Sequence, residues 1–300
     1  MPPMDEFTTF PHRHEFLVGI DSDGCAFDTM ELKHKECFIP AIIRHFELQP
    51  VATYARQAAE FVNLYSRWRG INRFPALLKT MELLAARPEV AERQARVPRL
   101  DVLRAWLEHE PKPSEPALVA ALDGAHGPAA AELRRVLAWS RAVNTSIAET
   151  VRAVPPFPFV RAALARAALR ADIIVVSATP GEALRREWSE HGLAEFVALI
   201  AGQELGRKAD HLRLAAGGRY AAGHVLMIGD APGDMDAAGA VGALFFPVNP
   251  GREAASWRRL HDEALDRFFA GNYAGDYEAR LSAEFATLLP ERPPWETAPA

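Results

Sequence analysis

The 300-residue sequence has only two cysteines, Cys25 and Cys37, which is too few for a disulfide-stapled secreted scaffold. No stretch approaches the roughly 20 consecutive apolar residues of a membrane helix, and the first residues lack the apolar centre of a signal peptide. Basic charge is not in excess either, because 34 Lys+Arg against 39 Asp+Glu give a net charge of −5. We therefore expect a cytoplasmic protein that binds neither nucleic acid nor a membrane.

Short apolar runs rich in β-branched residues alternate with segments of helical composition along much of the chain. Five such runs are present, at 16–20, 172–176, 196–200, 224–228 and 243–247. Continuous apolar strands separated by helices are typical of a parallel sheet that is covered on both faces. The sequence therefore predicts an α/β fold in which helices flank a five-stranded parallel sheet.

Residues 29–154 interrupt this pattern after the first strand, because they show amphipathic helical periodicity and almost no strand-like run. We expect an inserted all-helical domain there, so that residues 1–28 and 155–250 together form the α/β domain. Helical patterns after residue 250 predict that residues 251–300 form a helical extension packed on the α/β domain.

An acid pair, Asp21 and Asp23, follows the first predicted strand and precedes Gly24. Ligands of parallel sheets bind beyond the carboxyl ends of the strands, so both carboxylates can face one pocket if the chain bends at Gly24. Clustered carboxylates need a cation to offset their repulsion, and a hard cation such as Mg²⁺ suits oxygen ligands. The alternative is a plain turn, since Asp, Ser and Gly are common turn residues.

Three further strands also end in polar groups. Ser177 and Ala178 precede a predicted helix, where a hydroxyl and backbone N–H groups can hold a phosphate. Lys208 follows the third strand of a chain that has five lysines against 29 arginines, and Asp230 and Asp234 follow the fourth strand. Taken singly, each group has a plain alternative as a helix cap, a surface lysine or a turn.

The order of these groups resembles the haloacid dehalogenase-like (HAD) superfamily. Residues 21–29, Asp-Ser-Asp-Gly-Cys-Ala-Phe-Asp-Thr, are similar to its first motif, commonly DxDGTLxD[ST]. The second, third and fourth motifs are matched in order by Ser177, Lys208 and Gly229-Asp230-x-x-x-Asp234. The resemblance covers residues 16–28 and about 157–248, and it implies a Rossmann-like core.

The resemblance also implies a role for each matched residue. Asp21 attacks phosphorus to form an aspartyl-phosphate, and Asp23 protonates the leaving oxygen and then deprotonates the attacking water. The implied Mg²⁺ ligands are the Asp21 carboxylate, the main-chain carbonyl of Asp23 and Asp230, and Asp234 is either a further ligand or a support behind the ligands. The implied substrate-binding residues in this domain are Gly24, Ser177, Ala178 and Lys208.

The inserted helical segment resembles the C1 cap of this superfamily, which closes over the core and excludes water. Between two of its helices, residues 67–73 (Arg-Trp-Arg-Gly-Ile-Asn-Arg) are similar to the substrate loop of β-phosphoglucomutase-like members. Arg69 and Arg73 are therefore candidate substrate-binding residues. A solvated, arginine-rich helix end is the alternative.

Together these features predict a Mg²⁺-dependent phosphatase that acts on a small phosphorylated metabolite. Asp23 argues against dehalogenation, because a halide leaving group needs no proton. Two alternatives are a sugar phosphomutase with the same aspartyl-phosphate and a non-catalytic binding or regulatory protein on the same scaffold. The sequence leaves open the substrate and the choice between a monomer and a homodimer.

Overall fold

The computed structural model describes residues 5–297, which divide into two compact units. The first, here called the sheet unit, contains the chain up to Met30 together with Ala153–Leu289. The second, the helical unit, contains Glu31–Arg152 and the chain from Pro290 onward. Among the described residues, no helix combines the length and apolar content that a membrane span requires.

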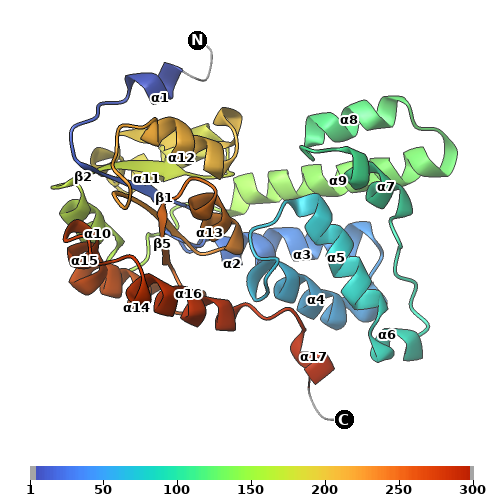
Figure 1. The fold of residues 1–300 in the computed structure, drawn as a ribbon. Helices are drawn as coiled ribbons and strands as arrows, with labels where there is room; N and C mark the ends of the chain where they lie inside the picture. The colour runs from blue at the N-terminus through green and yellow to red at the C-terminus, as the bar shows by residue number, and fades with distance from the viewer. Residues whose placement is uncertain (1–4, 298–300) are drawn as a thin grey trace. The chain divides into compact units, whose positions relative to one another are not determined.

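The sheet unit is built on five parallel strands, confirming the predicted α/β fold (Figure 1). The strands are β1 (Phe16–Ile20), β2 (Ala171–Val176), β3 (Leu199–Ala201), β4 (Val225–Gly229) and β5 (Leu244–Pro247). Their order in the sheet is β3-β2-β1-β4-β5, so β1 is central and pairs with both β2 and β4. Every residue of β1 and β2 is buried, as expected for strands covered on both faces.

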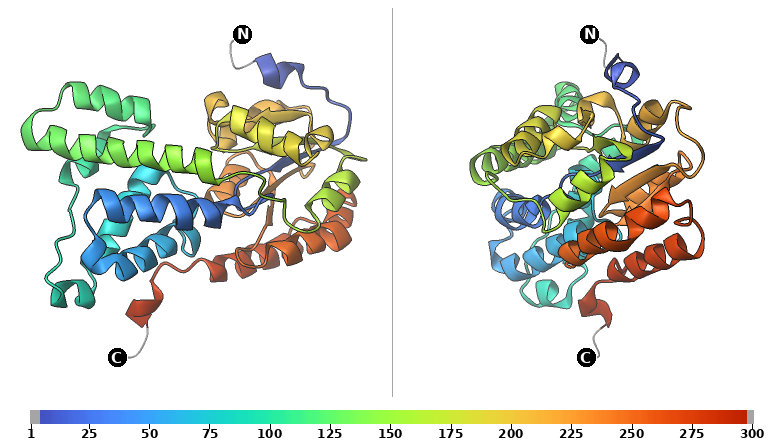
Figure 2. Two further views of the ribbon diagram at one scale, coloured as in Figure 1. Left: turned by 180° about the vertical axis from the view of Figure 1, so that it is seen from behind. Right: turned by 90° about the vertical axis from the view of Figure 1, so that its left-hand side faces the viewer.

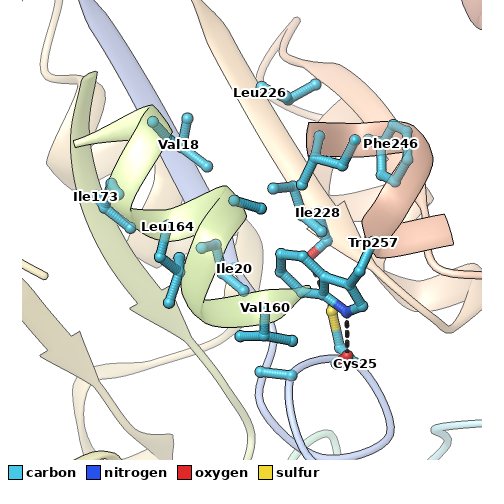
Figure 3. Packing of buried hydrophobic residues seen from close by; sticks show 14 of the residues in the cluster. Val18, Ile20, Cys25, Val160, Leu164, Ile173, Leu226, Ile228, Phe246 and Trp257 are labelled. Carbon is cyan, nitrogen blue, oxygen red and sulfur yellow. Dashed lines mark hydrogen bonds between the residues drawn. The ribbon is translucent and has the colours of Figure 1, made fainter. Parts of the chain in front are cut away.

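Alternate residues of β1 enter two apolar layers on opposite faces of the sheet. Val18 and Ile20 pack in the layer shown in Figure 3, whereas Leu17 packs in the other. The first layer is covered by α10 (Val160–Ala167), α11 (Gly181–Glu190), α14 (Glu253–Arg259) and α15 (Leu265–Phe269). The second is covered by α1 (Asp5–Thr9), α12 (Lys208–Ala216) and α13 (Pro232–Gly239).

The chain after residue 250 contributes to both units. Residues up to Leu289 pack on the sheet, where Tyr273 donates its hydroxyl to the carbonyl of Phe245 in β5 at 2.7 Å. The helix α16 (Asp276–Leu288) follows, drawn in red in Figure 2. In contrast, Trp295 in α17 (Pro294–Thr297) belongs to the helical unit, where its ring lies 5.7 Å from that of Phe61.

The helical unit contains no strand among its described residues, as expected for the insert. Its core surrounds Trp139, which is buried and lies edge-on to Phe74. Its longer helices are α3 (Ile39–His45), α4 (Ala52–Leu64), α5 (Arg73–Ala85), α7 (Asp101–His109), α8 (Glu115–Asp123) and α9 (Gly127–Thr150). The shorter segments are α2 (Thr29–Leu32), which begins in the sheet unit, the π-helix Lys33–Phe38, the 3₁₀ turn Gln49–Val51 and α6 (Pro88–Glu92).

Candidate active site

Three buried carboxylates meet at the carboxyl end of the sheet. Asp21 directly follows β1, Asp230 directly follows the adjacent strand β4, and Asp234 lies in the first turn of α13. One carboxylate oxygen from each lies within 4.8 Å of the others, and none of the three residues is more than 5% exposed. Parallel pairing of β1 and β4 explains how residues so far apart in the chain come together.

The ammonium of Lys208 faces this cluster. Its Nζ lies 2.7 Å from Oδ2 of Asp21 and 2.6 Å from Oδ1 of Asp234. Burial alone would lower the pKa of Lys208, but these two carboxylates reverse that effect and raise it above its ordinary value. Lys208 is therefore charged at any physiological pH and offsets part of the negative charge.

Lys208 carries one positive charge and contacts two of the three carboxylates, those of Asp21 and Asp234. Burial raises the pKa of Asp21 to about 6, with Asp234 adding to the rise and Lys208 opposing it. Burial also raises the pKa of Asp234, and the nearby carboxylate of Asp230 raises it further. Both shifts favour the protonated carboxyl groups, and additional positive charge at the cluster would favour the ionised ones.

A divalent cation fits this donor set. Carboxylate oxygens are the ligands that Mg²⁺ prefers, and three of them converge from a buried position. Asp21, Asp230 and Asp234 are the residues that would hold the ion. The main-chain carbonyl of Asp23, the fourth ligand implied by the sequence resemblance, stays a prediction.

The backbone around the cluster is shaped by two glycines. Gly24 has a φ of +75°, a conformation that favours glycine, and it makes the bend after Asp23 that the sequence analysis anticipated. A β-carbon at Gly229 would lie 2.3 Å from the β-carbon of Asp234. Glycine at position 229 therefore allows Asp234 to pack against the end of β4.

Asp23 lies in a different environment from Asp21. It is partly exposed, and each of its carboxylate oxygens accepts a hydrogen bond from a threonine hydroxyl. Thr29 donates to Oδ1 at 2.5 Å and Thr179 donates to Oδ2 at 2.8 Å. The sequence analysis did not select either threonine, although Thr29 ends the segment compared with the first motif and Thr179 lies two residues after Ser177.

The segment after β2 carries the candidate phosphate-binding groups. Ser177 is buried, and its Oγ accepts a hydrogen bond from the N–H of Thr179 at 3.2 Å. The next residue, Ala178, is exposed. The helix α11 then begins at Gly181, whose N–H donates to the carboxylate of Glu204 at 3.1 Å. Ser177 and Ala178 therefore lie in the short segment between β2 and α11, and the first N–H of α11 is already bonded to a carboxylate.

Arg69 and Arg73 lie in the helical unit and have partners there. Arg69 is 3% exposed and donates to the carbonyl of Leu64 at 2.9 Å, so it is not part of a solvated helix end. Arg73 donates to the side chains of Ser140 and Asn144 on α9, at 3.1 and 2.8 Å. Both guanidinium groups thus join segments of the helical unit, and their predicted contact with substrate stays a prediction.

No protein-family model matches the chain, and no curated protein matches its sequence. Solved structures do match. The chain is similar to a haloacid dehalogenase-like hydrolase, SP0104 from Streptococcus pneumoniae, with 15% identity and a TM-score of 0.40 over 83% of this chain and 91% of the other.

Two further solved structures are similar to this chain, with comparable sequence identities and TM-scores. CbbY from Rhodobacter sphaeroides, in complex with phosphate, is 20% identical with a TM-score of 0.40, over 80% of this chain and 87% of its own. A predicted phosphoglycolate phosphatase from Haemophilus somnus is 16% identical with a TM-score of 0.39, over 79% and 86%. Haloacid dehalogenase-like proteins and phosphatases are thus among the structures that this chain resembles.

Proposed function

We propose that the protein is a Mg²⁺-dependent phosphatase that hydrolyses a small phosphorylated metabolite through an aspartyl-phosphate on Asp21. The observation that supports this proposal most strongly is the buried cluster of Asp21, Asp230 and Asp234 around Lys208. Such a cluster is costly to bury, and its charges are suited to phosphoryl transfer, where positioning and charge neutralisation supply most of the catalysis.

Asp21 is the nucleophile in this proposal because both of its carboxylate oxygens are held in place. Oδ1 accepts the N–H of Ser22 at 2.8 Å, and Oδ2 lies 2.7 Å from Nζ of Lys208. Attack forms a bond from Asp21 to phosphorus while the bond from phosphorus to the leaving oxygen breaks. Lys208 reduces the repulsion between the carboxylate and the phosphoryl oxygens. Bound Mg²⁺ would supply further positive charge to the same oxygens.

Asp23 is the acid and base. It gives a proton to the leaving oxygen in the first step and takes one from the attacking water in the second, which releases Asp21 and inorganic phosphate. Thr29 and Thr179 orient the two oxygens of Asp23. Ser177, the N–H of Ala178 and Lys208 bind the transferring phosphoryl group in this account.

Hydrolysis of p-nitrophenyl phosphate by the purified protein, with and without Mg²⁺, tests the proposal. We expect Mg²⁺-dependent release of phosphate that Asp21→Asn abolishes. Asp236→Asn is the matched control, because Asp236 is an exposed carboxylate on α13 and should leave the rate unchanged. An Asp21→Asn variant as active as the parent would exclude the proposed nucleophile.

The same preparation can then be screened against phosphorylated metabolites to find the substrate. Rapid turnover with water as the acceptor supports a phosphatase. Slow hydrolysis of the aspartyl-phosphate together with a requirement for a sugar bisphosphate would instead identify a phosphomutase.

A further inference from the structure

Ser22, the residue between the two proposed catalytic acids, has a fully buried side chain with two partners on α11. The indole N–H of Trp188 donates to Oγ of Ser22 at 3.0 Å, and Oγ of Ser22 donates to Oε2 of Glu187 at 3.2 Å. The hydroxyl therefore acts as both acceptor and donor. Two consecutive residues of α11 therefore hold the side chain of Ser22.

The main chain of Ser22 contacts the groups on either side of it. Its N–H donates to Oδ1 of Asp21 at 2.8 Å. Its carbonyl accepts the N–H groups of Ala26 and Phe27, at 2.9 and 3.0 Å, in the turn that follows Asp23. A displacement of Ser22 would therefore rotate the carboxylate of Asp21 and disturb the turn after Asp23.

The helix that holds Ser22 also follows the candidate phosphate-binding residues. Chain segment 177–180 leads directly into α11, and Thr179 donates to Asp23 at 2.8 Å. Two turns later, Glu187 and Trp188 contact Ser22. Trp188 is fully buried and packs edge-on to Phe27 at 5.7 Å, so it is a rigid support.

We propose that Ser22 is a positioning residue: its hydroxyl, held by Trp188 and Glu187, sets the place of the Asp21 carboxylate relative to a phosphoryl group bound at Ser177. The inference rests on the proposed phosphatase function and adds a residue to it. The competing explanation is that Ser22 only satisfies the buried indole N–H of Trp188 and contributes to stability.

The variants Ser22→Ala, Trp188→Phe and the double variant separate these explanations. Ser22→Ala leaves the indole N–H and the Glu187 carboxylate without their hydroxyl partner, which should lower stability. Adding Trp188→Phe removes the unsatisfied donor, although it also leaves a cavity in the core. The double variant should therefore lose less stability than the sum of the losses of the two single variants. Urea unfolding gives the stabilities, and steady-state kinetics with p-nitrophenyl phosphate give kcat and KM.

A positioning role predicts that kcat of Ser22→Ala falls about tenfold while KM changes less than about twofold, since a misplaced nucleophile slows the chemical step. It also predicts that kcat stays low in the double variant, because removal of the indole N–H does not restore the Ser22 hydroxyl. If kcat of Ser22→Ala stays close to the parent value, or if the double variant has a clearly higher kcat than Ser22→Ala, the positioning role is overturned.

A second pair of variants changes Glu187, the partly buried residue that accepts the hydrogen bond from the Ser22 hydroxyl. Glu187→Gln keeps an oxygen that can accept from Ser22, whereas Glu187→Ala does not. We expect Glu187→Ala to lower kcat more than Glu187→Gln does, and equal values would contradict the proposal.

Asp21→Asn, measured in the same assays, shows whether a failure concerns only the role of Ser22 or the whole phosphatase mechanism. If Asp21→Asn is inactive while Ser22→Ala and Glu187→Ala match the parent, only the role of Ser22 is wrong. If Asp21→Asn is as active as the parent, the phosphatase mechanism and the role of Ser22 both fail.

Discussion

The main-chain N–H of Asp21 donates to the carbonyl of Ile228 at 3.0 Å, which extends the pairing of β1 with β4 past the end of β1. Asp230 lies two residues beyond Ile228, so the register of the two strands decides where both carboxylates leave the sheet. The proposed metal site is therefore a consequence of strand pairing in the centre of the sheet.

The close packing of Gly229 against Asp234 predicts that Gly229→Ala damages the site. The added methyl group would lie 2.3 Å from the β-carbon of Asp234 and must displace it. We expect phosphatase activity to fall at least about tenfold, because displacement of a catalytic group by about 1 Å is costly. Gly233→Ala is the matched control, since a β-carbon there would have no neighbour within 4 Å. Equal activities of the two variants would contradict this account of Gly229.

The carboxylate cluster predicts that Mg²⁺ stabilises the folded protein. A ligand that binds only the folded state raises the free energy of unfolding by about 2.7 kcal/mol at a concentration of 100 times its Kd. We expect Mg²⁺ to raise the thermal unfolding temperature of the parent and of Asp236→Asn, and to raise that of Asp230→Asn much less. EDTA should reverse the increase. An equal increase in all three proteins would show that the ion binds elsewhere.

The contacts of Arg73 predict a structural effect of its removal. Arg73→Ala deletes the hydrogen bonds to Ser140 and Asn144 and the packing of the guanidinium over Phe38 at 5.2 Å. We expect the free energy of unfolding to fall by about 1–3 kcal/mol in urea titrations. Arg99→Ala, at a side chain that is 86% exposed, should change it by less than about 1 kcal/mol.

The same variant also tests the sequence-based hypothesis that Arg73 binds substrate. A purely structural Arg73 predicts equal losses of kcat/KM for p-nitrophenyl phosphate and for the natural substrate. A larger loss for the natural substrate would show that Arg73 also recognises it.

His211 predicts a pH dependence of stability. It is fully buried and its ring stacks on Phe7 at 5.8 Å. Burial lowers its pKa from 6.5 to about 4; Lys208 adds to the decrease, while Asp210 and Glu204 oppose it. Between these values the unfolded chain binds a proton that the folded chain does not. The free energy of unfolding should therefore fall as the pH decreases from about 6.5 to 4, by up to about 3 kcal/mol from this group.

Urea unfolding of the parent and of His211→Leu between pH 4 and 7 measures this contribution. The variant should show a weaker decrease of stability toward low pH than the parent. His12→Leu, at an exposed histidine of the same unit, should keep the parent's dependence. Parallel curves for all three proteins would show that His211 does not contribute.

The sheet could be predicted because its strands are continuous apolar runs. The residues at which each strand begins and ends could be predicted less well. The third run was predicted at 196–200, but β3 is Leu199–Ala201 because Ala194–Phe196 form a 3₁₀ turn. An apolar pattern alone does not separate a partly buried turn from a strand.

The candidate site was predictable to the extent that its groups follow strand ends. Asp21, Asp230 and Lys208 could be selected because each comes shortly after an apolar run. The contacts of Ser22 with Trp188, and of Arg73 with Ser140, join positions more than 60 residues apart and leave no periodic signal. Such contacts depend on helix packing, which sequence spacing does not specify.

The most direct test of the account is to identify the residue that becomes phosphorylated. In Asp23→Asn, p-nitrophenyl phosphate should still phosphorylate Asp21, because its leaving group needs little help from an acid, whereas hydrolysis of the aspartyl-phosphate should be slow without the base. Borohydride reduction of the quenched protein followed by peptide mass spectrometry should then find homoserine at position 21. Phosphatase turnover with unmodified Asp21, or with the modification at another residue, would contradict the account.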